Sequence, residues 1–556
     1  FGEFCENNHT LVPCGYPIEW HKQVLKSKGE LPTDWIDPTY ERAKEMCAQL
    51  GVPLHPKYNM FWSDMDIESL KKLREHILNT GSYDGKNLTL GKEPETKRIM
   101  ELMCVPHRVI EMRVVIDDRY SEPMMDGLGI LHGGASLEPG RDLEGDTVLQ
   151  AVSNAAGYEI RARAMTRVGT RMGRPEKAKE RELAPKLHCV FPVGKDADAG
   201  KEINAAIKVS KSQLSNYSGE APSITETVAN RYCATCNKYT FRNWCRICGG
   251  HTVYVPKPNQ FGDPGPAEMK IELENELNAA CEYLGIKNPG DIKCVDTLTS
   301  KTKTVEPLEK GILRTKNGIS VFKDGTVRFD MTDIPLTHFK PREIGLSINK
   351  AHELGYLTDW NGDPLVDPEQ ICELKVQDVV PAKDCGDYLA KVAKYLDDEL
   401  ELLYHLPRYY NVENRTDLIG NIVFGLAPHT SGCILCRIIG YADVRGCYGH
   451  PFFHAAKRRN CDGDEDCLML GLDALLNFSR SFLPDKRGGL MDAPLVLTTR
   501  LDPNEIDKEA HNVDCLREYT LELYEAAMAM KEPKEIEKMM DLIASRIGTE
   551  KQYEGM

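Results

Sequence analysis

The sequence predicts an α+β protein with several domains. Its 556 residues exceed the usual length of one domain, helical and strand-like segments both occur along it, and paired cysteines mark a small separate module. The chain is 41% hydrophobic and 28% charged, and it lacks an apolar stretch of the roughly 18 residues that a membrane helix needs. We therefore expect a soluble, globular protein. Because the first residue is Phe1 rather than Met, we also expect a piece of a longer polypeptide.

The order of the elements follows from the spacing of apolar residues. A helical period predicts helices over 39–50, 67–78, 268–284 and 388–404. Alternation and short apolar runs predict strands over 108–116, 422–424, 433–441 and 493–499. Asn317-Gly318 and Asp324-Gly325 flank a short apolar segment and predict a three-stranded meander with two tight hairpins. The Pro- and Gly-rich segment 256–266 indicates a linker.

Four of the 19 cysteines form two CxxC pairs, Cys233 with Cys236 and Cys245 with Cys248. Eight residues, 237–244, separate the two pairs. Tetrahedral Zn²⁺ takes four thiolates at this spacing, and a site with four protein ligands leaves no position open for water. We therefore predict a structural zinc ribbon over about 228–255.

One basic segment contrasts with the rest of an acidic chain. The net charge of −15 argues mildly against a general affinity for nucleic acid, but the distribution of charge matters more than its sum. Residues 161–186, the basic segment, hold nine basic residues against three acidic ones. We expect it to contact phosphates, and the alternative is a solvated helix face. The nine residues are Arg161, Arg163, Arg167, Arg171, Arg174, Lys177, Lys179, Arg181 and Lys186.

The most specific chemistry lies in residues 460–466, the acidic loop. Alternate Asp residues in an extended loop point to one side, and Mg²⁺ prefers oxygen ligands of this kind. Lys457, Arg458 and Arg459 directly precede the loop and suit a polyanion, so the segment indicates phosphoryl transfer. An EF-hand fits poorly, because it needs Gly and Glu at positions that are not Gly and Glu here. The serious alternative is a solvated turn in which Asp466 caps a following helix.

Two further groups near this loop have more ordinary interpretations. Cys433 and Cys436 form a third CxxC pair, but it lies in an apolar run without a partner pair, so we expect buried free thiols. His450 and His454 stand four residues apart and could share a metal on a helix. No Cys or carboxylate stands at a matching spacing, so we expect polar contacts near the acidic loop.

The residues of several segments resemble the large subunit of archaeal family D DNA polymerase. The likeness runs in order along the chain through 1–4, 6–9, 171–181, 454–466, 475–480, 483–489 and 491–498. The family's subunit is longer at both ends, so this chain looks like its central catalytic portion. The extra cysteines Cys5, Cys14, Cys433, Cys436 and Cys467 depart from the family pattern.

The resemblance implies a catalytic core of two double-psi β-barrels, an architecture shared with multisubunit RNA polymerases, together with a zinc ribbon and helical accessory or clamp segments. The first barrel would hold the basic segment and the second the acidic loop. The expected domains are an N-terminal part of the core (1–94), the first barrel (95–215), the ribbon and linker (216–265), an accessory region (266–405), the second barrel (406–505) and a helical C-terminal segment (506–556).

The resemblance also implies template-directed DNA synthesis with two Mg²⁺ ions, in which a primer 3′-hydroxyl attacks the α-phosphate of a dNTP. Asp462 and Asp464 are the expected metal ligands, and Asn460 would orient the loop or touch a nucleotide. Asp466 is expected to cap a helix that follows the loop. Lys177 and Lys179 are candidates for the triphosphate, but both reach one phosphate only if their segment is extended.

Other contacts are expected with DNA and with partner proteins. His9 and Asn8 are site candidates by resemblance alone. The residues expected to bind nucleic acid through its phosphates are Arg171, Arg174, Arg181, Lys457, Arg458 and Arg459. The expected partners are primer–template DNA, dNTPs, a small proofreading exonuclease subunit and a sliding clamp, in the cytoplasm. The competing hypotheses are an RNA polymerase-like enzyme or nuclease that uses the same loop, and a non-catalytic DNA-binding scaffold.

Overall fold

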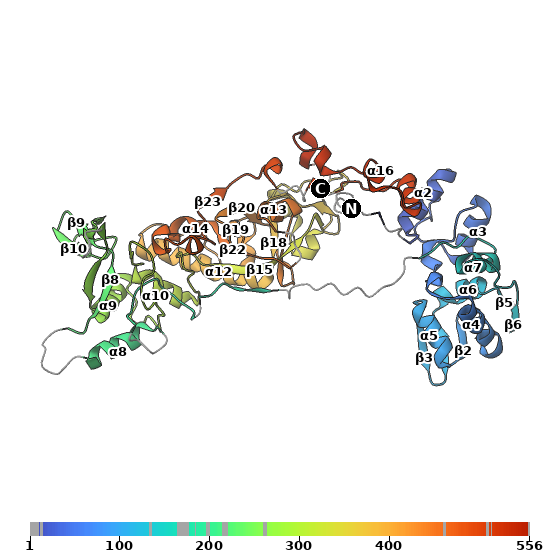
Figure 1. Ribbon diagram of the computed structural model, residues 1–556, viewed down its shortest axis with the longest axis horizontal. Helices are drawn as coiled ribbons and strands as arrows, with labels where there is room; N and C mark the ends of the chain where they lie inside the picture. The colour runs from blue at the N-terminus through green and yellow to red at the C-terminus, as the bar shows by residue number, and fades with distance from the viewer. Residues whose placement is uncertain are drawn as a thin grey trace. The chain divides into compact units, whose positions relative to one another are not determined.

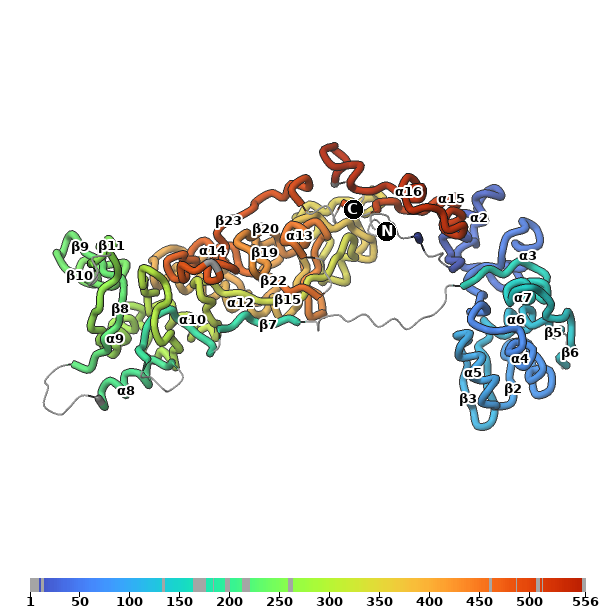
Figure 2. The backbone as a smooth tube through the Cα atoms, in the orientation of Figure 1, coloured from blue at the N-terminus to red at the C-terminus, as the bar shows by residue number. Residues whose placement is uncertain are grey.

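The computed structural model describes residues 10–11, 15–132, 136–163, 177–183, 185–195, 201–213, 221–258, 264–459, 463–506, 511–512 and 514–553. The chain forms two compact units, Phe1–Arg171 with Asn512–Arg546 and Met172–His511 with Ile547–Met556. Figures 1 and 2 show the elements of each unit and the course of the backbone. In the described part of the chain, no helix is both long enough and apolar enough to span a membrane.

The first unit packs helices against a four-stranded sheet in the order β1–β2–β4–β3, with a separate hairpin of β5 and β6. Its strands are β1 (Ser82–Tyr83), β2 (Leu88–Gly91), β3 (His107–Ile110), β4 (Arg113–Ile116), β5 (Ile130–His132) and β6 (Leu137–Pro139). Its helices are α2 (Ile18–Lys28), α3 (Tyr40–Leu50), α4 (Ile67–Thr80), α5 (Pro94–Leu102), α6 (Asp118–Gly127), α7 (Val148–Ala156), α15 (Leu521–Met528) and α16 (Pro533–Glu537). Fully buried side chains such as Leu70, Leu73 and Met124 form its core.

Local sequence signals set the helix boundaries in this unit. Thr39 caps α3 and Asp66 caps α4, each accepting a hydrogen bond from a backbone N–H of the first turn. The first two predicted helices are thereby confirmed. The strand predicted over 108–116 is instead the hairpin of β3 and β4, because the chain turns at Glu111, whose φ is 53°.

The second unit contains a closed six-stranded barrel. Among its strands, Figure 1 labels β15, β18, β19, β20 and β22. Its strands pair in the order β18–β21–β15–β22–β19–β20, and β20 returns to β18. They are β15 (Phe329–Pro335), β18 (Asp378–Pro381), β19 (Ile422–Leu426), β20 (Gly432–Ile438), β21 (Gly446–Gly449) and β22 (Glu465–Leu470). Strand β23 (Val496–Thr498) extends the sheet beside β20. The strands predicted near 422–424 and 433–441 are confirmed.

The barrel draws together parts of the chain that are far apart in sequence. Strands β15 and β18 lie before the range 406–505 that was expected to form a barrel alone. One edge of β15 is shared: its first residues pair with β7 (Ala178–Glu180) and its last with β21. Between 95 and 215, the described residues form no second closed barrel, so the second barrel and the double-psi topology stay predictions.

The remaining described elements of the second unit surround the barrel or form smaller sheets. Three short strands, β9 (Arg231–Cys233), β10 (Lys238–Thr240) and β11 (Val253–Tyr254), form the sheet around the cysteine pairs. Two-stranded sheets pair β8 (Ile224–Val228) with β14 (Ala267–Ile271), β12 (Lys257–Pro258) with β13 (Pro264–Gly265), and β16 (His338–Phe339) with β17 (Cys372–Glu373). The helices are α8 (Ile203–Gln213), α9 (Leu273–Leu284), α10 (Leu308–Asn317), α11 (Ile348–Glu353), α12 (Lys383–Asp398), α13 (Pro451–Ala456) and α14 (Gly471–Asn477).

Three expectations about local structure are wrong. Asn317-Gly318 ends α10 instead of turning a hairpin, with Gly318 in the left-handed conformation that both structures use. The helix predicted from 268 begins only at Leu273, because the preceding residues form β14. The apolar run after the acidic loop is strand β22 rather than a helix. By contrast, the helix predicted over 388–404 lies in α12 and the π-helical turn Glu399–Leu403 that follows it.

Candidate active site and cysteine cluster

Helix α13 packs closely against the barrel just before the acidic loop. His450 caps the helix by accepting a hydrogen bond from the backbone N–H of Phe452 at 3.1 Å. Two glycines make room for it. A Cβ on Gly425 of β19 would lie 2.9 Å from the ring of Phe453, and one on Gly449 of β21 would lie 2.9 Å from His454. The two glycines therefore allow α13 to pack close to the strands, so that its polar side chains contact buried residues of the barrel.

A buried ionic network joins α13, β15 and β22. The ammonium of Lys457 lies 3.3 Å from Asp333 and contacts the Asp466 carboxylate. Arg459 donates through Nε to Asp466 at 3.0 Å. The side chains of Lys457, Asp333 and Asp466 are 4% exposed or less, and buried charges are tolerated only when they are paired in this way. We call Asp333, Lys457, Arg459 and Asp466 the buried ionic network.

Burial shifts the pKa values of the groups in this network. Burial raises the pKa of Asp466 to about 7, and Lys457 opposes the shift. Burial also lowers the pKa of His454 to about 3, so its imidazole is neutral at physiological pH. His454 Nε2 lies 3.1 Å from the carbonyl oxygen of Ile334, and Nδ1 lies 3.3 Å from Asp333. Hence Lys457 and Arg459 are the cations that face the two carboxylates.

The end of the acidic loop lies next to the network. The backbone N–H of Asp333 donates to the carbonyl oxygen of Asp464 at 2.8 Å, which continues the pairing of β15 and β22 toward the loop. Arg459 Nη1 lies 4.0 Å from the Asp464 carboxylate, and this side chain is 14% exposed. Asp462 and Asn460 lie outside the described residues. The end of the loop at Asp464 is thus held in place next to β22, the strand that contains Asp466.

The described part of the basic segment near the barrel is extended. In β7, Lys179 pairs with Asp330 of β15, and Lys177 also hydrogen-bonds β15 through its backbone. Lys177 Nζ contacts the Glu465 carboxylate, and the Lys179 side chain is exposed. Side chains at alternate positions of a strand point to the same side. The extended conformation that both lysines need to reach one phosphate is therefore present at 177–180.

Arg181 lies deeper than the two lysines. Its Nε donates to Asp330 at 2.7 Å, and its guanidinium lies over the Phe322 ring at 5.3 Å. Burial raises the pKa of Asp330, and Arg181 and Lys177 oppose the shift. Arg181 was expected to contact nucleic acid, but the structure places it in an ion pair on the barrel.

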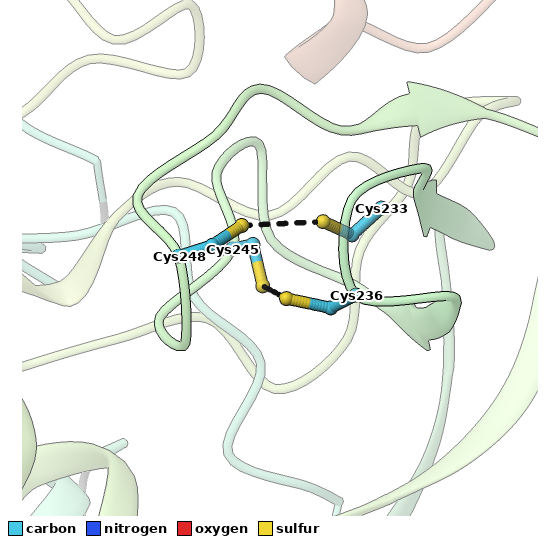
Figure 3. Close-up of side chains that lie close together, drawn as sticks. All are labelled: Cys233, Cys236, Cys245 and Cys248. Atoms are coloured by element: carbon cyan, nitrogen blue, oxygen red, sulfur yellow. Dashed lines mark hydrogen bonds between the residues drawn. The ribbon is translucent and has the colours of Figure 1, made fainter.

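The four paired cysteines converge in the second unit. Figure 3 shows their sulfur atoms pointing toward one another across the short strands. The Sγ atoms of Cys233 and Cys248 lie 3.5 Å apart, and those of Cys245 and Cys236 lie 3.8 Å apart. Four thiolates at about 2.3 Å from a tetrahedral Zn²⁺ would lie roughly 3.8 Å from one another. Backbone N–H groups of Cys248 and Ile247 lower the pKa of Cys245 to about 6, whereas the hydrogen bond with Cys248 raises the pKa of Cys236 to about 12, so the support for zinc is the convergence of the four sulfur atoms. The cluster therefore fits zinc.

The structure brings together some of the predicted residues and repositions others. Lys177, Lys179 and Asp464 lie on the neighbouring strands and loop described above. Arg458 is exposed, and its φ is 59°. Lys457 was expected to contact DNA, but its ammonium is buried between two carboxylates. Other predicted residues lie outside the described part of the chain, namely Asn8, His9, Arg171 and Arg174.

Asp466 was expected to cap a helix, and this is wrong. It lies in β22 with a buried carboxylate that two cations contact. The expected thiols are found: Cys433 and Cys436 are buried in β20. The sequence interpretation missed Asp333, Asp330 and Glu465. The available signal for Asp333 was an Asp within an apolar strand-like segment, but its partners come from another part of the chain.

Comparison with known proteins shows that the chain is similar to large subunits of DNA polymerases. Residues 1–262 match the family model described as DNA polymerase II large subunit DP2, central domain, and residues 285–556 match the one described as its catalytic domain. Proteins named DNA polymerase II large subunit are similar along all of this chain, at 45% identity in Methanocella arvoryzae, 44% in Archaeoglobus fulgidus and 43% in Methanothermobacter thermautotrophicus.

The chain belongs to the family of DNA polymerase II large subunits. It spans about half the length of the curated relatives it matches, with 50% of the Methanocella protein and 49% of the other two covered. The matched segments contain both the cysteine cluster and the barrel with the acidic loop.

Proposed function

We propose that this chain is the central catalytic part of the large subunit of a family D DNA polymerase. In this proposal it transfers a nucleotide from a dNTP to a primer 3′-hydroxyl as directed by a template. The observation that carries the proposal is the end of the acidic loop, which leads into β22, one strand away from the extended segment 177–180 with its two lysines, in a chain whose relatives are named DNA polymerase II large subunit.

Asp462 and Asp464 would hold Mg²⁺. Asp464 fits this role because its carboxylate lies at the end of a fixed strand and is partly accessible. Bound Mg²⁺ would lower the pKa of the primer hydroxyl and neutralise charge on the leaving pyrophosphate. Asn460 would orient the loop. The ion pairs of Asp466 with Lys457 and Arg459 hold the strand that follows, so the loop residues need little reorganisation to bind metal.

Lys179 is the described residue best suited to the triphosphate, since its ammonium is exposed on an extended strand. Lys177 would join it by exchanging its contact with Glu465 for phosphate. Arg171, Arg174 and the exposed Arg458 would hold DNA phosphates, which position DNA without reading its sequence. Asn8 and His9 remain candidates by family resemblance.

Further parts of the proposal concern the whole protein. The core would contain two double-psi β-barrels, of which the six-stranded barrel would be one. The cysteine cluster would hold structural Zn²⁺, since its four thiols leave no ligand position for water. Primer–template DNA would be the substrate, and a small proofreading subunit and a sliding clamp would be partners of the complete large subunit.

Primer extension by the complete large subunit with its small subunit tests the proposal. With a primed template and Mg²⁺, the wild-type protein should incorporate dNTPs and discriminate against NTPs. Asp464→Ala should abolish incorporation while primer–template affinity stays within a fewfold. Asp443→Ala is the matched control, because this Asp is exposed and lies on the same barrel unit. Extension by Asp464→Ala at a rate near wild type would refute the assignment of the acidic loop, and preferential use of NTPs would favour the RNA polymerase-like alternative.

A further inference from the structure

Three potential metal ligands, from β15, α13 and β22, meet next to the end of the acidic loop. One ligand atom each from Asp333, His454 and Asp466 lie within 4.8 Å of one another, and all three residues are buried. Two carboxylates and a neutral imidazole form a donor set that divalent transition metals bind. We call these three residues the inner ligand group. By ligand type alone, this group would compete with the acidic loop for divalent ions.

Lys457 lies against the two carboxylates of the inner ligand group. Its ammonium lies 3.3 Å from Asp333, contacts Asp466 and lies 4.4 Å from the centre of the Phe453 ring. The carboxylates and the ring face thus hold the cation from several sides. The side chain is 2% exposed, which leaves it little freedom to move away.

The polar atoms that Lys457 does not hydrogen-bond are atoms that could bind a metal ion. Asp333 Oδ2 is buried and has no hydrogen-bond partner. His454 Nδ1 lies 3.3 Å from Asp333 Oδ1 but makes no hydrogen bond, because the neutral ring carries its proton on Nε2, toward the carbonyl oxygen of Ile334. Buried polar atoms without partners are rare, and each needs an explanation. An ammonium supplies the positive charge that this group needs, but it cannot form bonds with every ligand atom as a metal ion would.

We propose that Lys457 is a positioning residue that takes the place of a divalent ion in the inner ligand group. Its permanent charge keeps this group free of metal and fixes β22 without any ion. As a consequence, which rests on the function proposed above, Mg²⁺ is directed to the acidic loop.

Charge balance makes this role testable. Lys457 and Arg459 together balance Asp333 and Asp466 in the wild-type protein. Lys457→Met keeps a side chain of similar length but leaves two carboxylates facing one cation. A divalent ion bound by Asp333, His454 and Asp466 would remove this excess of negative charge and leave one net positive charge. The double variant Lys457→Met/Asp333→Asn restores the balance without an ion, because one carboxylate then faces one cation.

Metal uptake without DNA or nucleotide is the decisive measurement. Each protein is purified, incubated with Co²⁺ and desalted, and its metal content and visible absorption spectrum are recorded. Lys457→Met should retain about one more Co²⁺ per chain than the wild type, with a d–d band that the wild type lacks. Added Co²⁺ should slow the hydrogen exchange of β22 at least tenfold in this variant, because binding to the folded state stabilises it. The double variant should retain no extra ion and show no such slowing.

Lys310→Met is the matched control. Lys310 is also a buried lysine of the same unit, but its contacts are Glu399 and Asn477, without a histidine. Its removal should destabilise the unit, and Co²⁺ should not restore it. If Lys457→Met folds only with Co²⁺, the proposal is supported. If Lys457→Met does not fold with or without Co²⁺, the double variant decides: it should fold without metal, and failure to do so would overturn the proposal.

A folded Lys457→Met that retains no more Co²⁺ than the wild type would also overturn it. The link to catalysis has a separate measurement: the Mg²⁺ concentration for half-maximal primer extension should rise severalfold in Lys457→Met but not in Lys310→Met. An unchanged Mg²⁺ requirement would overturn that link. Absence of extension by the wild type would instead refute the proposed function, and the Co²⁺ result would still decide the role of Lys457.

Discussion

Asp466→Asn should destabilise the barrel far more than the loss of a helix cap would. At a pH above the raised pKa of about 7, the substitution removes one charge from a carboxylate that is 4% exposed and faces Lys457 and Arg459. Removing one partner of a buried ion pair costs about 3–5 kcal/mol, because the other charge stays buried without compensation. Lys457 keeps Asp333 at 3.3 Å, so we expect the lower end, about 3 kcal/mol. A helix cap would contribute only about 1 kcal/mol.

Hydrogen exchange of the barrel strands measures this cost directly. Two compact units make a single unfolding midpoint hard to interpret, whereas exchange of β15, β19 and β22 reports on the barrel itself. Since about 1.4 kcal/mol is a factor of ten, the slowest amides of β22 should exchange roughly 100-fold faster in Asp466→Asn. The control is Asp443→Asn, because Asp443 is 90% exposed and forms a surface pair with Lys383. A change below about fivefold in Asp466→Asn would refute the view that its carboxylate holds the network together.

Two more predictions follow from the cysteine cluster and from the first unit. Protein purified without chelator should contain about one zinc per chain, and Cys236→Ala should reduce this to near zero, as measured by elemental analysis; equal zinc in both proteins would contradict the assignment. Burial lowers the pKa of His21 to about 3 and that of His55 to about 4, whereas both should be roughly 6.5 in the unfolded chain. The unfolded state therefore binds more protons than the folded state, and the first unit should lose stability as the pH falls from about 6.5 to 4. His21→Leu should reduce this loss between pH 7 and 5, as measured by hydrogen exchange of α2 and α3, and an equally steep loss in the variant would count against it.

The acid sensitivity of His55 has a structural cause. Its Nδ1 accepts a hydrogen bond from the backbone N–H of Lys57 at 3.1 Å, and its Nε2 lies 3.0 Å from the carbonyl oxygen of Trp35. The neutral ring satisfies both contacts when the proton is on Nε2. Protonation of Nδ1 would break the first contact and bury a charge, so the fold favours the neutral form.

Local chemistry made part of the structure predictable. The CxxC spacing located the cysteine cluster, since the ligands of a zinc ribbon come from two short turns. Polar residues before apolar periodic segments located α3 and α4. The same kind of signal failed at Asn317-Gly318, because a left-handed residue suits both a tight hairpin and the end of a helix. It failed again after the acidic loop, because a short apolar run fits either a strand or a buried helix.

The inner part of the site was unpredictable for a different reason. Lys457 and Asp333 are 124 positions apart, and the packing of α13 against β15 brings them into contact. In the sequence alone, Lys457 is one of three adjacent cations and Asp466 one of several acids. Burial separates their roles: it places Lys457 between two carboxylates and leaves Arg458 exposed. The sequence shows the charges of such a site, and the fold decides which of them are neutralised internally.

Strand geometry connects the basic segment to the acidic loop. On a helix, Lys177 and Lys179 would point in different directions, so both could not serve one phosphate. In the structure they lie on the extended chain at β7, beside β15, whose other edge pairs with β22. Adjacent strands lie about 4.8 Å apart, so only about 10 Å separate the backbone of β7 from that of β22. The contact of Lys177 with Glu465 spans this distance, next to Asp464. In the function proposed above, a triphosphate that reached Asp464 through a metal ion would therefore lie within reach of Lys177.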